Sequence, residues 1–399
     1  MEWKEVTLGE IGTIVGGATP STKNTSFYDG NIPWLTPKDL SVNSNKYIFR
    51  GERNITEAGF KSCSCKMLPK GSVLFSSRAP IGYVAIAANE MCTNQGFKSV
   101  ITNEETDSEF LYYLLKYNKD NIASQGSGTT FAEVSGKTMK DIEVVVPKEK
   151  EDQRRIASIL SSLDRKIELN NKINADLEEM AQAIFKNWFV DFEPFKDGKF
   201  VDSELGMIPE GWKVGTLGDI TKNKSAKVKE RNDVKVLSPV TTGELVLSEE
   251  YFTKQVFSSS IAKYKIVNKG DFAYNPARVN IGSLGRNEFD FDGCVSPVYV
   301  VFSVLDGYEN YFDLFRKTDF FKDSVASLAI GGVRQSLSYD DLSSIEVIIP
   351  SENAVEEFNN LYNQMKKTIK ANKLENSRLS LLRDTLPPRL MSGELEVPE

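Results

Sequence analysis

The segments "EWKEVTLGEI" (residues 2–11) and "GWKVGTLGDI" (residues 211–220) share six of their ten aligned residues. Glu10 and Asp219 also match in charge. The second segment begins just past the middle of the 399-residue chain. Similarity between two distant parts of one chain is the mark of a repeated structural unit. The sequence therefore predicts that the fold begins a second time near its middle.

Further segments repeat in the same order. The matching pairs are 70–82 with 269–282, 91–100 with 293–302 (aligned on Cys92 and Cys294), and 126–147 with 330–350. Short runs rich in Val, Ile, Phe and Tyr alternate with turn-forming residues in each half, with helical patterns near 108–120 and 308–323. Such alternation predicts strands joined by turns. Each half is expected to be a mixed α/β unit with a curved or barrel-like sheet.

A long helix is predicted after each half, since residues 152–187 contain neither Pro nor Gly. Residues spaced by seven form an expected seam on each helix: Ile156, Leu163, Asn170, Leu177 and Ile184 on the first, and Phe358, Met365, Asn372, Leu379 and Leu386 on the second. Heptads favour helix–helix pairing, although packing on a globular core gives a similar pattern. A helix of about 35 residues spans roughly 50 Å, which favours pairing. Asn170 and Asn372 would fix register within the seam or lie solvated at its edge.

The predicted fold class is α+β, with two pseudo-repeated α/β domains and two long helices that pack on each other as a coiled coil, away from both domains. The expected parts are a first α/β domain at 1–148, a long helix at 149–190, a linker at 191–210, a second α/β domain at 211–350, and a C-terminal helix and tail at 351–399. Pro, Gly and Asp are frequent in the linker region. Its aromatic residues are expected to anchor it to a neighbouring part: Phe189, Phe192, Phe195 and Phe200.

Composition limits the possible functions. No stretch approaches 18 apolar residues and the start "MEWKEV" is charged, so neither a membrane span nor a secretory signal is expected, and we expect a cytoplasmic protein. The chain has four cysteines and no histidine, which excludes Ser-His-Asp and Cys-His catalysis and disfavours a zinc site. A net charge of −7 argues mildly against an isolated nucleic-acid binder, although the total does not show which face carries the charge.

Catalytic motifs are missing from the sequence. There is no phosphate-binding loop and no dinucleotide-binding glycine pattern. The string "NPAR" (275–278) lacks the second proline and the aromatic residue of the Asn-Pro-Pro-aromatic motif of amino-methyltransferases. Carboxylates and lysines at 191–199 have the composition of a magnesium-dependent nuclease site but fall in the linker, where a solvated turn is the simpler interpretation. We therefore expect no enzyme activity and no metal or cofactor site in this chain.

Polar loop residues at matching places in the two halves are the candidate DNA contacts. Arg can read guanine and Asn or Gln can read adenine, whereas Lys, Ser and Thr bind phosphates. The candidates in the first half are Thr19, Ser21, Thr22, Lys23, Asn24, Thr36, Lys38, Ser76, Ser77, Arg78, Thr129 and Thr130. Those in the second half are Lys222, Lys224, Lys227, Asn275, Arg278, Asn280, Arg334, Gln335 and Ser336. Each of these residue types is also common in solvated loops. Their occurrence at matching places in both halves therefore favours DNA contact by the set as a whole rather than by any one residue.

These features together resemble the specificity subunit of type I restriction–modification enzymes. The resemblance is carried by the two repeat starts, by "GGATPST…IPWLTPKDL" (16–40), by the helix and linker at 153–195, and by "LLRDTLPPRLMSGEL" (381–395). It covers essentially the whole chain. It implies two target-recognition domains that each read half of a bipartite double-stranded DNA target. It also implies that two long antiparallel coiled-coil helices separate the two domains. These helices would set the half-site spacing and dock two methyltransferase subunits.

The resemblance also implies that restriction subunits join the complex. S-adenosylmethionine, ATP and Mg²⁺ would then bind to the partner subunits, and this chain would hold no cofactor and contact no membrane. Residues 221–233 do not repeat residues 15–26, so the two halves are expected to reach different half-sites of an asymmetric target. Two other hypotheses remain at this point: a coiled-coil scaffold whose repeats bind proteins, and a self-sufficient nuclease or methyltransferase.

Overall fold

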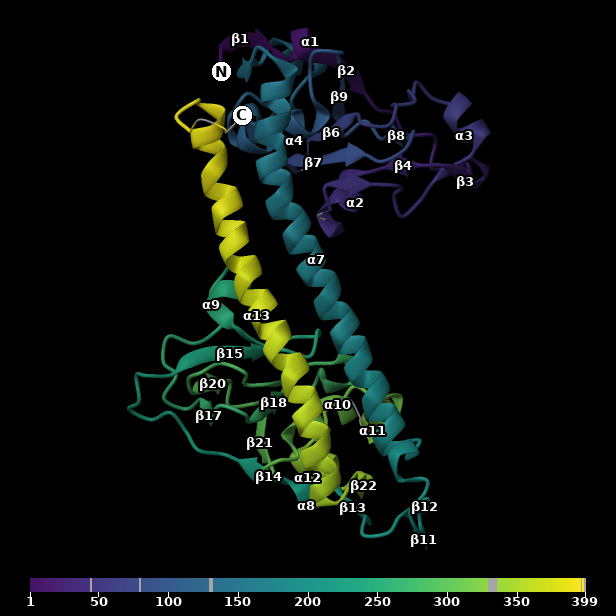
Figure 1. The fold of residues 1–399 in the computed structure, drawn as a ribbon, viewed down its shortest axis with the longest axis vertical. Coiled ribbons are helices and arrows are strands. Elements are labelled where there is room, and N and C mark those ends of the chain that lie inside the picture. The colour runs from purple at the N-terminus through teal and green to yellow at the C-terminus, as the bar shows by residue number, and fades with distance from the viewer. Residues whose placement is uncertain (44, 79, 129–131, 329–335, 396, 398–399) are drawn as a thin grey trace. The chain divides into compact units, whose positions relative to one another are not determined.

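The structure is a computed structural model that describes residues 1–399 except 44, 79, 129–131, 329–335, 396 and 398–399 (Figure 1). The chain folds as two compact units: Met1–Asn171 with Asn372–Glu399, and Lys172–Ala371. Each unit contains one repeated half and part of each long helix. The predicted division had treated the helices as separate parts, whereas the compact units each include a portion of both.

Both halves begin with the same structure. The first strand of each half pairs antiparallel with its last strand: β1 (Trp3–Thr7) with β10 (Glu143–Pro147), and β13 (Lys213–Thr216) with β22 (Glu346–Ile349). A one-turn helix follows: α1 (Leu8–Ile11) and α8 (Leu217–Ile220). The Thr7 N–H donates to the Glu10 carboxylate at 2.6 Å, and the Thr216 N–H donates to Asp219 at 2.7 Å. The repeated Thr-Leu-Gly-acidic string therefore encodes a capping box in both places.

The backbone contacts of these short helices also repeat. The Leu8 N–H donates to the Ile142 carbonyl and the Leu217 N–H donates to the Ile345 carbonyl, both at 2.9 Å. Leu8 and Leu217 are fully buried. The internal repeat is thus confirmed down to single backbone hydrogen bonds.

The main sheets of the two halves share a strand order, β2-β9-β6-β7-β5 in the first and β14-β21-β18-β19 in the second. The strands are β2 (Gly12–Gly16), β9 (Lys98–Thr102), β6 (Val73–Ser77), β7 (Ile81–Ala87), β5 (Tyr47–Ile48), β14 (Thr221–Lys224), β21 (Val300–Val304), β18 (Phe272–Tyr274) and β19 (Leu284–Arg286). Neither ladder closes among the described residues, so of the two expected shapes, curved or barrel-like, the closed barrel is not formed.

Each half also contains a parallel strand pair: β4 (Trp34–Leu35) with β8 (Cys92–Thr93), and β15 (Lys235–Pro239) with β20 (Gly293–Val295). Cys92 and Cys294 are fully buried in these pairs, at the places where the sequences align. In the second half, β16 (Leu245–Leu247) and β17 (Lys265–Val267) extend the pair to four strands. The aligned segments 91–100 and 293–302 therefore occupy the same place in the two halves.

Helices cover these sheets where the sequence predicts them. They are α4 (Ser108–Tyr117) and α5 (Lys119–Ser124) in the first half, and α10 (Glu309–Phe315) and α11 (Asp319–Leu328) in the second. The remaining short elements are η1 (Thr25–Phe27), β3 (Tyr28–Ile32), α2 (Pro37–Val42), α3 (Glu57–Lys61), α6 (Gly136–Asp141), α9 (Ser248–Tyr251), η3 (Val279–Ile281) and α12 (Tyr339–Ser343). Phe110, Leu111, Phe312 and Leu314 on the covering helices are buried in the cores of the two halves.

The two long helices are α7 (Lys150–Phe189) and α13 (Glu352–Met391), each of 40 residues. Their prediction is confirmed. Of the expected seam residues, Ile156, Asn170 and Phe358 are buried. The others are half-buried: Leu163, Leu177, Ile184, Met365, Asn372, Leu379 and Leu386.

A polar layer joins the two helices within the first unit. The Asn170 side-chain N–H₂ donates to Glu375 at 2.8 Å and to Asn376 at 2.9 Å. Further along, Arg383 Nη1 lies 3.1 Å from the Asp164 carboxylate, so the helices run antiparallel there. Asn170 is 1% exposed. A buried amide with specific partners selects one register over its neighbours, which is the first of the two roles considered for Asn170.

Aromatic side chains hold the linker in the second unit. It contains η2 (Glu193–Phe195) and the hairpin β11 (Phe200–Ser203) with β12 (Gly206–Pro209). The rings of Phe192 and Phe195 lie 5.4 Å and 5.0 Å from the ring of Trp212. Trp212 belongs to the repeated opening segment and is 6% exposed. The linker is therefore anchored as expected, on the start of the second half.

Candidate nucleic-acid interface

The candidate loops of the first half meet at one turn, Asn94–Phe97, which connects β8 to β9. Backbone hydrogen bonds tie three loops to this region: Ala18 N–H to the Thr93 carbonyl (3.0 Å), Asn94 N–H to the Leu35 carbonyl (2.8 Å), and Ser77 N–H to the Gly96 carbonyl (2.7 Å). A fourth loop joins because the Val134 N–H donates to the Ser77 carbonyl at 2.9 Å. The loops near residues 18, 35, 77 and 134 thus form one contiguous surface.

The predicted contacts differ in how freely they face solvent. Ser21, Thr22, Lys23, Asn24 and Lys38 are exposed, and Thr19, Thr36 and Arg78 are half-buried. Some already have structural partners: the Asn24 side-chain oxygen accepts from the Ser26 N–H (3.1 Å), the Thr36 hydroxyl donates to Asp39 (2.7 Å), and the Lys38 ammonium pairs with Glu52 (2.8 Å). Among the described residues, Ser21, Thr22 and Lys23 are the exposed first-half candidates whose side chains have no such partner.

Two of the predicted contacts are wrong in this structure. Ser76 and Ser77 are fully buried on β6, which lies between β9 and β7. The Ser76 hydroxyl donates to the Pro80 carbonyl at 2.8 Å, and the Ser77 hydroxyl donates to the Gly96 carbonyl at 3.2 Å. A central strand has neighbours on both edges, and here it is also covered on both faces. These serines therefore hold the converging loops together and do not reach a phosphate.

Arg78 lies at the rim of the same surface, together with Lys98. Arg78 Nη1 is 3.8 Å and Lys98 Nζ is 3.1 Å from the carboxylate oxygens of Glu133. Two cations therefore share one carboxylate, which leaves a net positive charge at the rim. Thr129 and Thr130 lie outside the described residues, as do Arg334 and Gln335 of the second half.

The second half brings its loops together in the same way. The Leu337 N–H donates to the Pro276 carbonyl at 3.1 Å, which repeats the bond between Val134 and Ser77. Among the candidates, the exposed ones are Lys222, Lys227, Arg278, Asn280 and Ser336, and the half-buried ones are Lys224 and Asn275. The Asn275 side chain accepts from the Ala277 N–H at 3.1 Å, so it shapes the turn that presents Arg278.

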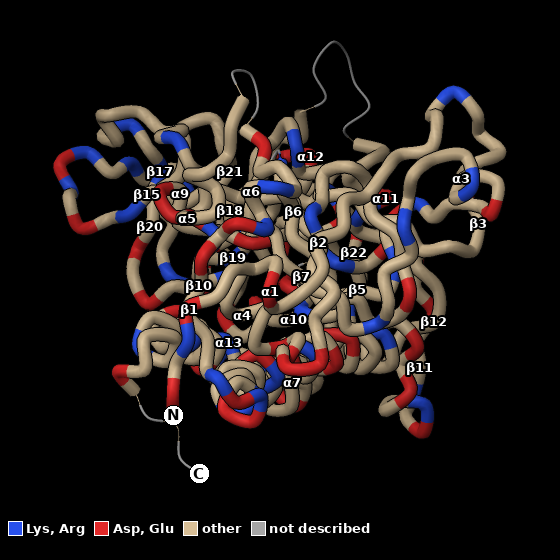
Figure 2. Tube along the Cα trace, turned by 90° about the horizontal axis from the view of Figure 1, so that it is seen from above, with Lys and Arg blue, Asp and Glu red and all other residues tan. Residues whose placement is uncertain are grey.

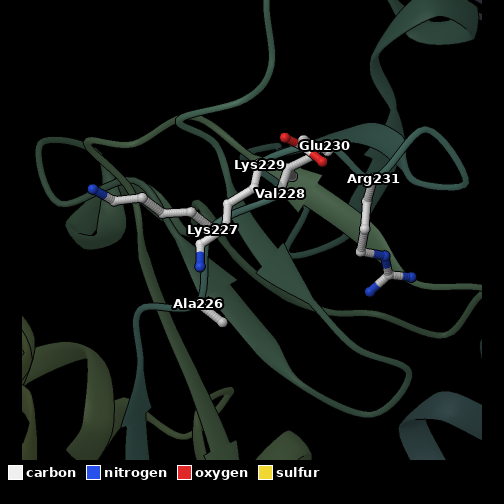
Figure 3. Close-up of a pocket in the computed structure, with 6 residues that line it drawn as sticks. All are labelled: Ala226, Lys227, Val228, Lys229, Glu230 and Arg231. Atoms are coloured by element: carbon white, nitrogen blue, oxygen red, sulfur yellow. The ribbon is translucent and has the colours of Figure 1, made fainter.

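A basic segment follows β14 in the second half. Figure 3 shows Lys227, Lys229 and Arg231 projecting from the segment that lines a shallow cavity of about 730 Å³ at residues 226–231. Lys229 adopts a left-handed backbone conformation (φ 55°), which side-chain-bearing residues adopt uncommonly. Arg231 is already bound by two carboxylates, Asp233 at 2.7 Å and Asp292 at 3.0 Å. Lys227 and Lys229 are therefore the free cations of this segment among the described residues.

Lys224 is held differently from Lys227. Its ammonium lies 2.7 Å and 2.9 Å from the two carboxylate oxygens of Asp271, which is 4% exposed. Burial raises the pKa of Asp271, and the ion pair with Lys224 opposes part of that effect. Lys224 thus neutralises an interior carboxylate, and little of its positive charge is available to a phosphate.

Three polar residues of these surfaces are absent from the predicted contacts: Gln95, Lys98 and Lys229. Gln95 is exposed at the turn where the first-half loops meet. The signal for it was the string "TNQGF" (93–97), in which Asn and Gly flank a polar residue. Asn and Gly in that arrangement are typical of a tight turn that points the intervening side chain outward.

The long helices carry a different charge pattern from these loops. Lys, Arg, Asp and Glu are interspersed in the sequence of α7, and the end-on view in Figure 2 shows both signs of charge on this helix. DNA binding through a helix face requires clustered Lys and Arg. In the described part of the chain, no three His, Cys, Asp or Glu side chains are placed to hold a metal ion, and no helix there has the length and apolar character needed to cross a bilayer.

Comparison with known proteins gives consistent results along the chain. The family model for the type I restriction modification DNA specificity domain matches residues 1–179. The specificity subunit of type I restriction enzyme MjaIX from Methanocaldococcus jannaschii is 36% identical over 412 aligned residues, which cover 100% of this chain and 94% of that protein. The specificity subunit of type I restriction enzyme HindI from Haemophilus influenzae is 25% identical, and the alignment covers 99% of this chain and 100% of that protein.

A solved structure shows the same fold. The S subunit of a type I restriction–modification system from M. genitalium superposes with a TM-score of 0.60 at 17% identity, covering 100% of this chain and 97% of that one. At that level of identity the match concerns the fold. It agrees with two repeated α/β halves and two long helices.

Proposed function

Because the chain belongs to the family of type I restriction–modification specificity subunits, we propose that each of its halves reads one half of a bipartite double-stranded DNA target. The supporting observation is the pair of equivalent loop clusters. Both are built on the same backbone hydrogen bonds, Val134 to Ser77 and Leu337 to Pro276, and they present different side chains. Equal scaffolds with unequal surfaces are what two readers of different half-sites require.

The loop chemistry fits direct reading of DNA. Exposed Lys23, Lys222 and Lys227 are suited to phosphates, and exposed Arg278 and Asn280 are suited to base edges. The acidic total charge is compatible with this function because the long helices carry acidic residues too, away from the loops proposed to read DNA. The coiled-coil scaffold considered above finds no support in the comparisons.

We propose that the helices set the half-site spacing and dock two methyltransferase subunits, and that restriction subunits join that complex. Large apolar side chains are exposed along both helices: Leu169 and Met180 on α7, and Leu374, Leu381 and Leu382 on α13. Exposed apolar side chains on a helix pair favour a protein partner. S-adenosylmethionine, ATP and Mg²⁺ would bind to the partner subunits, and this chain would act in the cytoplasm without catalysis of its own.

A domain exchange tests the proposed function. Residues 1–148 are replaced by the corresponding part of a relative, the chain is co-expressed with its methyltransferase, and methylated sequences are mapped by long-read sequencing. One half-site should change while the other half-site stays the same. A change in both half-sites, or in neither, would show that the halves do not read DNA independently. The purified chain without partners should methylate and cleave nothing.

A further inference from the structure

The turn at which the first-half loops meet has a counterpart in the second half. The Phe97 N–H donates to the Asn94 carbonyl at 3.3 Å, and the Tyr299 N–H donates to the Ser296 carbonyl at 3.0 Å. Both turns enter from the buried parallel strand that contains the aligned cysteine. Both lead into the strand that is second in the order of the main sheet, β9 or β21. The backbone thus presents the same turn twice.

The side chains at the tips of the two turns have different chemistry. Gln95 is exposed at the first turn, while Pro297 and Val298 are exposed at the second. Val298 is 72% exposed, although it is a large apolar residue. An amide can donate and accept hydrogen bonds, whereas valine offers only an apolar contact. A difference confined to the tips of a shared scaffold is what different half-sites would require.

Gln95 extends from a closely packed turn. A Cβ on Gly17 would lie 2.1 Å from the Thr93 carbonyl oxygen, and a Cβ on Gly96 would lie 2.9 Å from Pro37. No larger residue fits at either glycine without displacing its neighbours. The Gly96 N–H is also held by the Asn94 side chain at 2.8 Å. Close packing beneath the turn therefore fixes the backbone from which Gln95 extends.

The Gln95 amide is oriented by a neighbouring hydroxyl. The Thr19 hydroxyl donates to the Gln95 side-chain carbonyl oxygen. That oxygen keeps a second lone pair, and the amide nitrogen keeps two N–H donors. One acceptor beside one donor matches the adenine edge in the major groove, where N6–H donates and N7 accepts. Thr19 would limit the rotation of the amide and so reduce the entropy lost on binding.

We propose that Gln95 reads an adenine in the half-site bound by the first half, with Thr19 as its positioning residue. This assignment rests on the proposed function and specifies one residue and one base within it. At the equivalent turn, Val298 would contact the methyl group of a thymine, since that is the base feature an apolar side chain recognises.

The test uses the full chain in complex with its methyltransferase subunits. Gln95→Ala should relax a single base pair of one half-site, with discrimination reduced about 5- to 150-fold, as expected for loss of a bidentate contact. Gln95→Glu keeps the acceptor and loses the donor, so preference at that base pair should shift toward cytosine, whose N4–H₂ donates. Thr19→Val should weaken discrimination at the same base pair by a smaller factor.

Gln125→Ala is the matched control, because Gln125 is also an exposed glutamine of the first half and lies at the end of α5. It should leave the methylated sequence unchanged. If Gln95→Ala leaves the sequence unchanged too, or weakens all positions equally along with the thermal midpoint, the assignment of Gln95 is wrong and the proposed function stands. If the unaltered complex shows no sequence preference, the proposed function fails and this assignment fails with it.

Discussion

The contrast between Lys227 and Lys224 leads to a quantitative prediction about DNA affinity. Lys227 is exposed, and no carboxylate within the described residues lies at ion-pair distance from it. Lys224 has both oxygens of Asp271 within 2.9 Å. A lysine that contacts a phosphate releases a counterion on binding, so removing it makes the affinity less dependent on salt. We therefore expect Lys227→Ala to change the salt dependence of DNA affinity and Lys224→Ala to change the stability of the fold.

The magnitudes follow from these partners. Loss of one phosphate contact should reduce the slope of log affinity against log salt by about 0.9, which corresponds to about 3.5-fold between about 50 and about 200 mM salt. Lys227→Ala should show this change without loss of stability. Lys224→Ala leaves the buried Asp271 carboxylate without its cation, so it should lower the free energy of unfolding by about 1–3 kcal/mol and leave the slope nearly unchanged.

Fluorescence anisotropy with a labelled target duplex, over a series of salt concentrations, measures the slope for the complex with its methyltransferase subunits. Thermal unfolding of the same preparations measures stability. Lys229→Ala serves as a second free-cation variant and should behave like Lys227→Ala. The reasoning would be refuted if Lys224→Ala reduced the slope as much as Lys227→Ala at an unchanged midpoint, because an ion pair would then not decide which lysine binds phosphate.

Three other measurements test the fold and the spacing. Burial alone would raise the pKa of Asp313, but Arg316 and Lys317 lower it to about 2. The Asp313 carboxylate therefore contributes about 2 kcal/mol to the free energy of unfolding above pH 4, and this contribution is lost as the pH falls toward 2. Asp313→Asn should flatten the acid dependence of stability measured by urea unfolding. Phe358→Ala should cost the second unit about 3–5 kcal/mol, because Phe358 is buried 5.0 Å from the Phe189 ring; a cost below about 1 kcal/mol would contradict this packing. One heptad added to both long helices lengthens each by about 10 Å, near three base pairs of DNA, and sequencing of methylated sites should show a longer spacer; an unchanged spacer would mean that the helices do not set it.

Local patterns in the sequence determined much of this protein. The Thr-Leu-Gly-acidic string specifies a capping box wherever it occurs, so the repeat could be found from sequence alone. The first long helix was predictable because seven-residue spacing and the absence of Pro and Gly act within one segment. The second was predictable from its seven-residue spacing alone, since it contains Pro387 and Pro388. The linker's aromatic residues made its anchoring to a neighbouring part predictable, although the second half and its Trp212 as the partner were not.

Only the tertiary structure decided which polar residues are available to DNA. Ser76 and Ser77 are residue types that bind phosphates, yet β6 is central in its sheet and their hydroxyls donate to backbone carbonyls instead. Lys224 and Lys227 are alike in sequence, but an aspartate 47 residues from Lys224 binds only one of them. The closure of the sheet likewise depends on strand number and tilt across the whole half.

Gln95 is the opposite case, a residue that the sequence analysis did not select and that the structure places on the proposed DNA-binding surface. Its own segment indicates an exposed turn residue but not where its amide points. The orientation of the amide depends on Thr19, 76 residues away, and the position of the turn depends on the loops that bond to it. Sequence patterns determine hydrogen bonds and burial that repeat over a few residues, whereas a binding surface is made from segments that meet only when the chain folds.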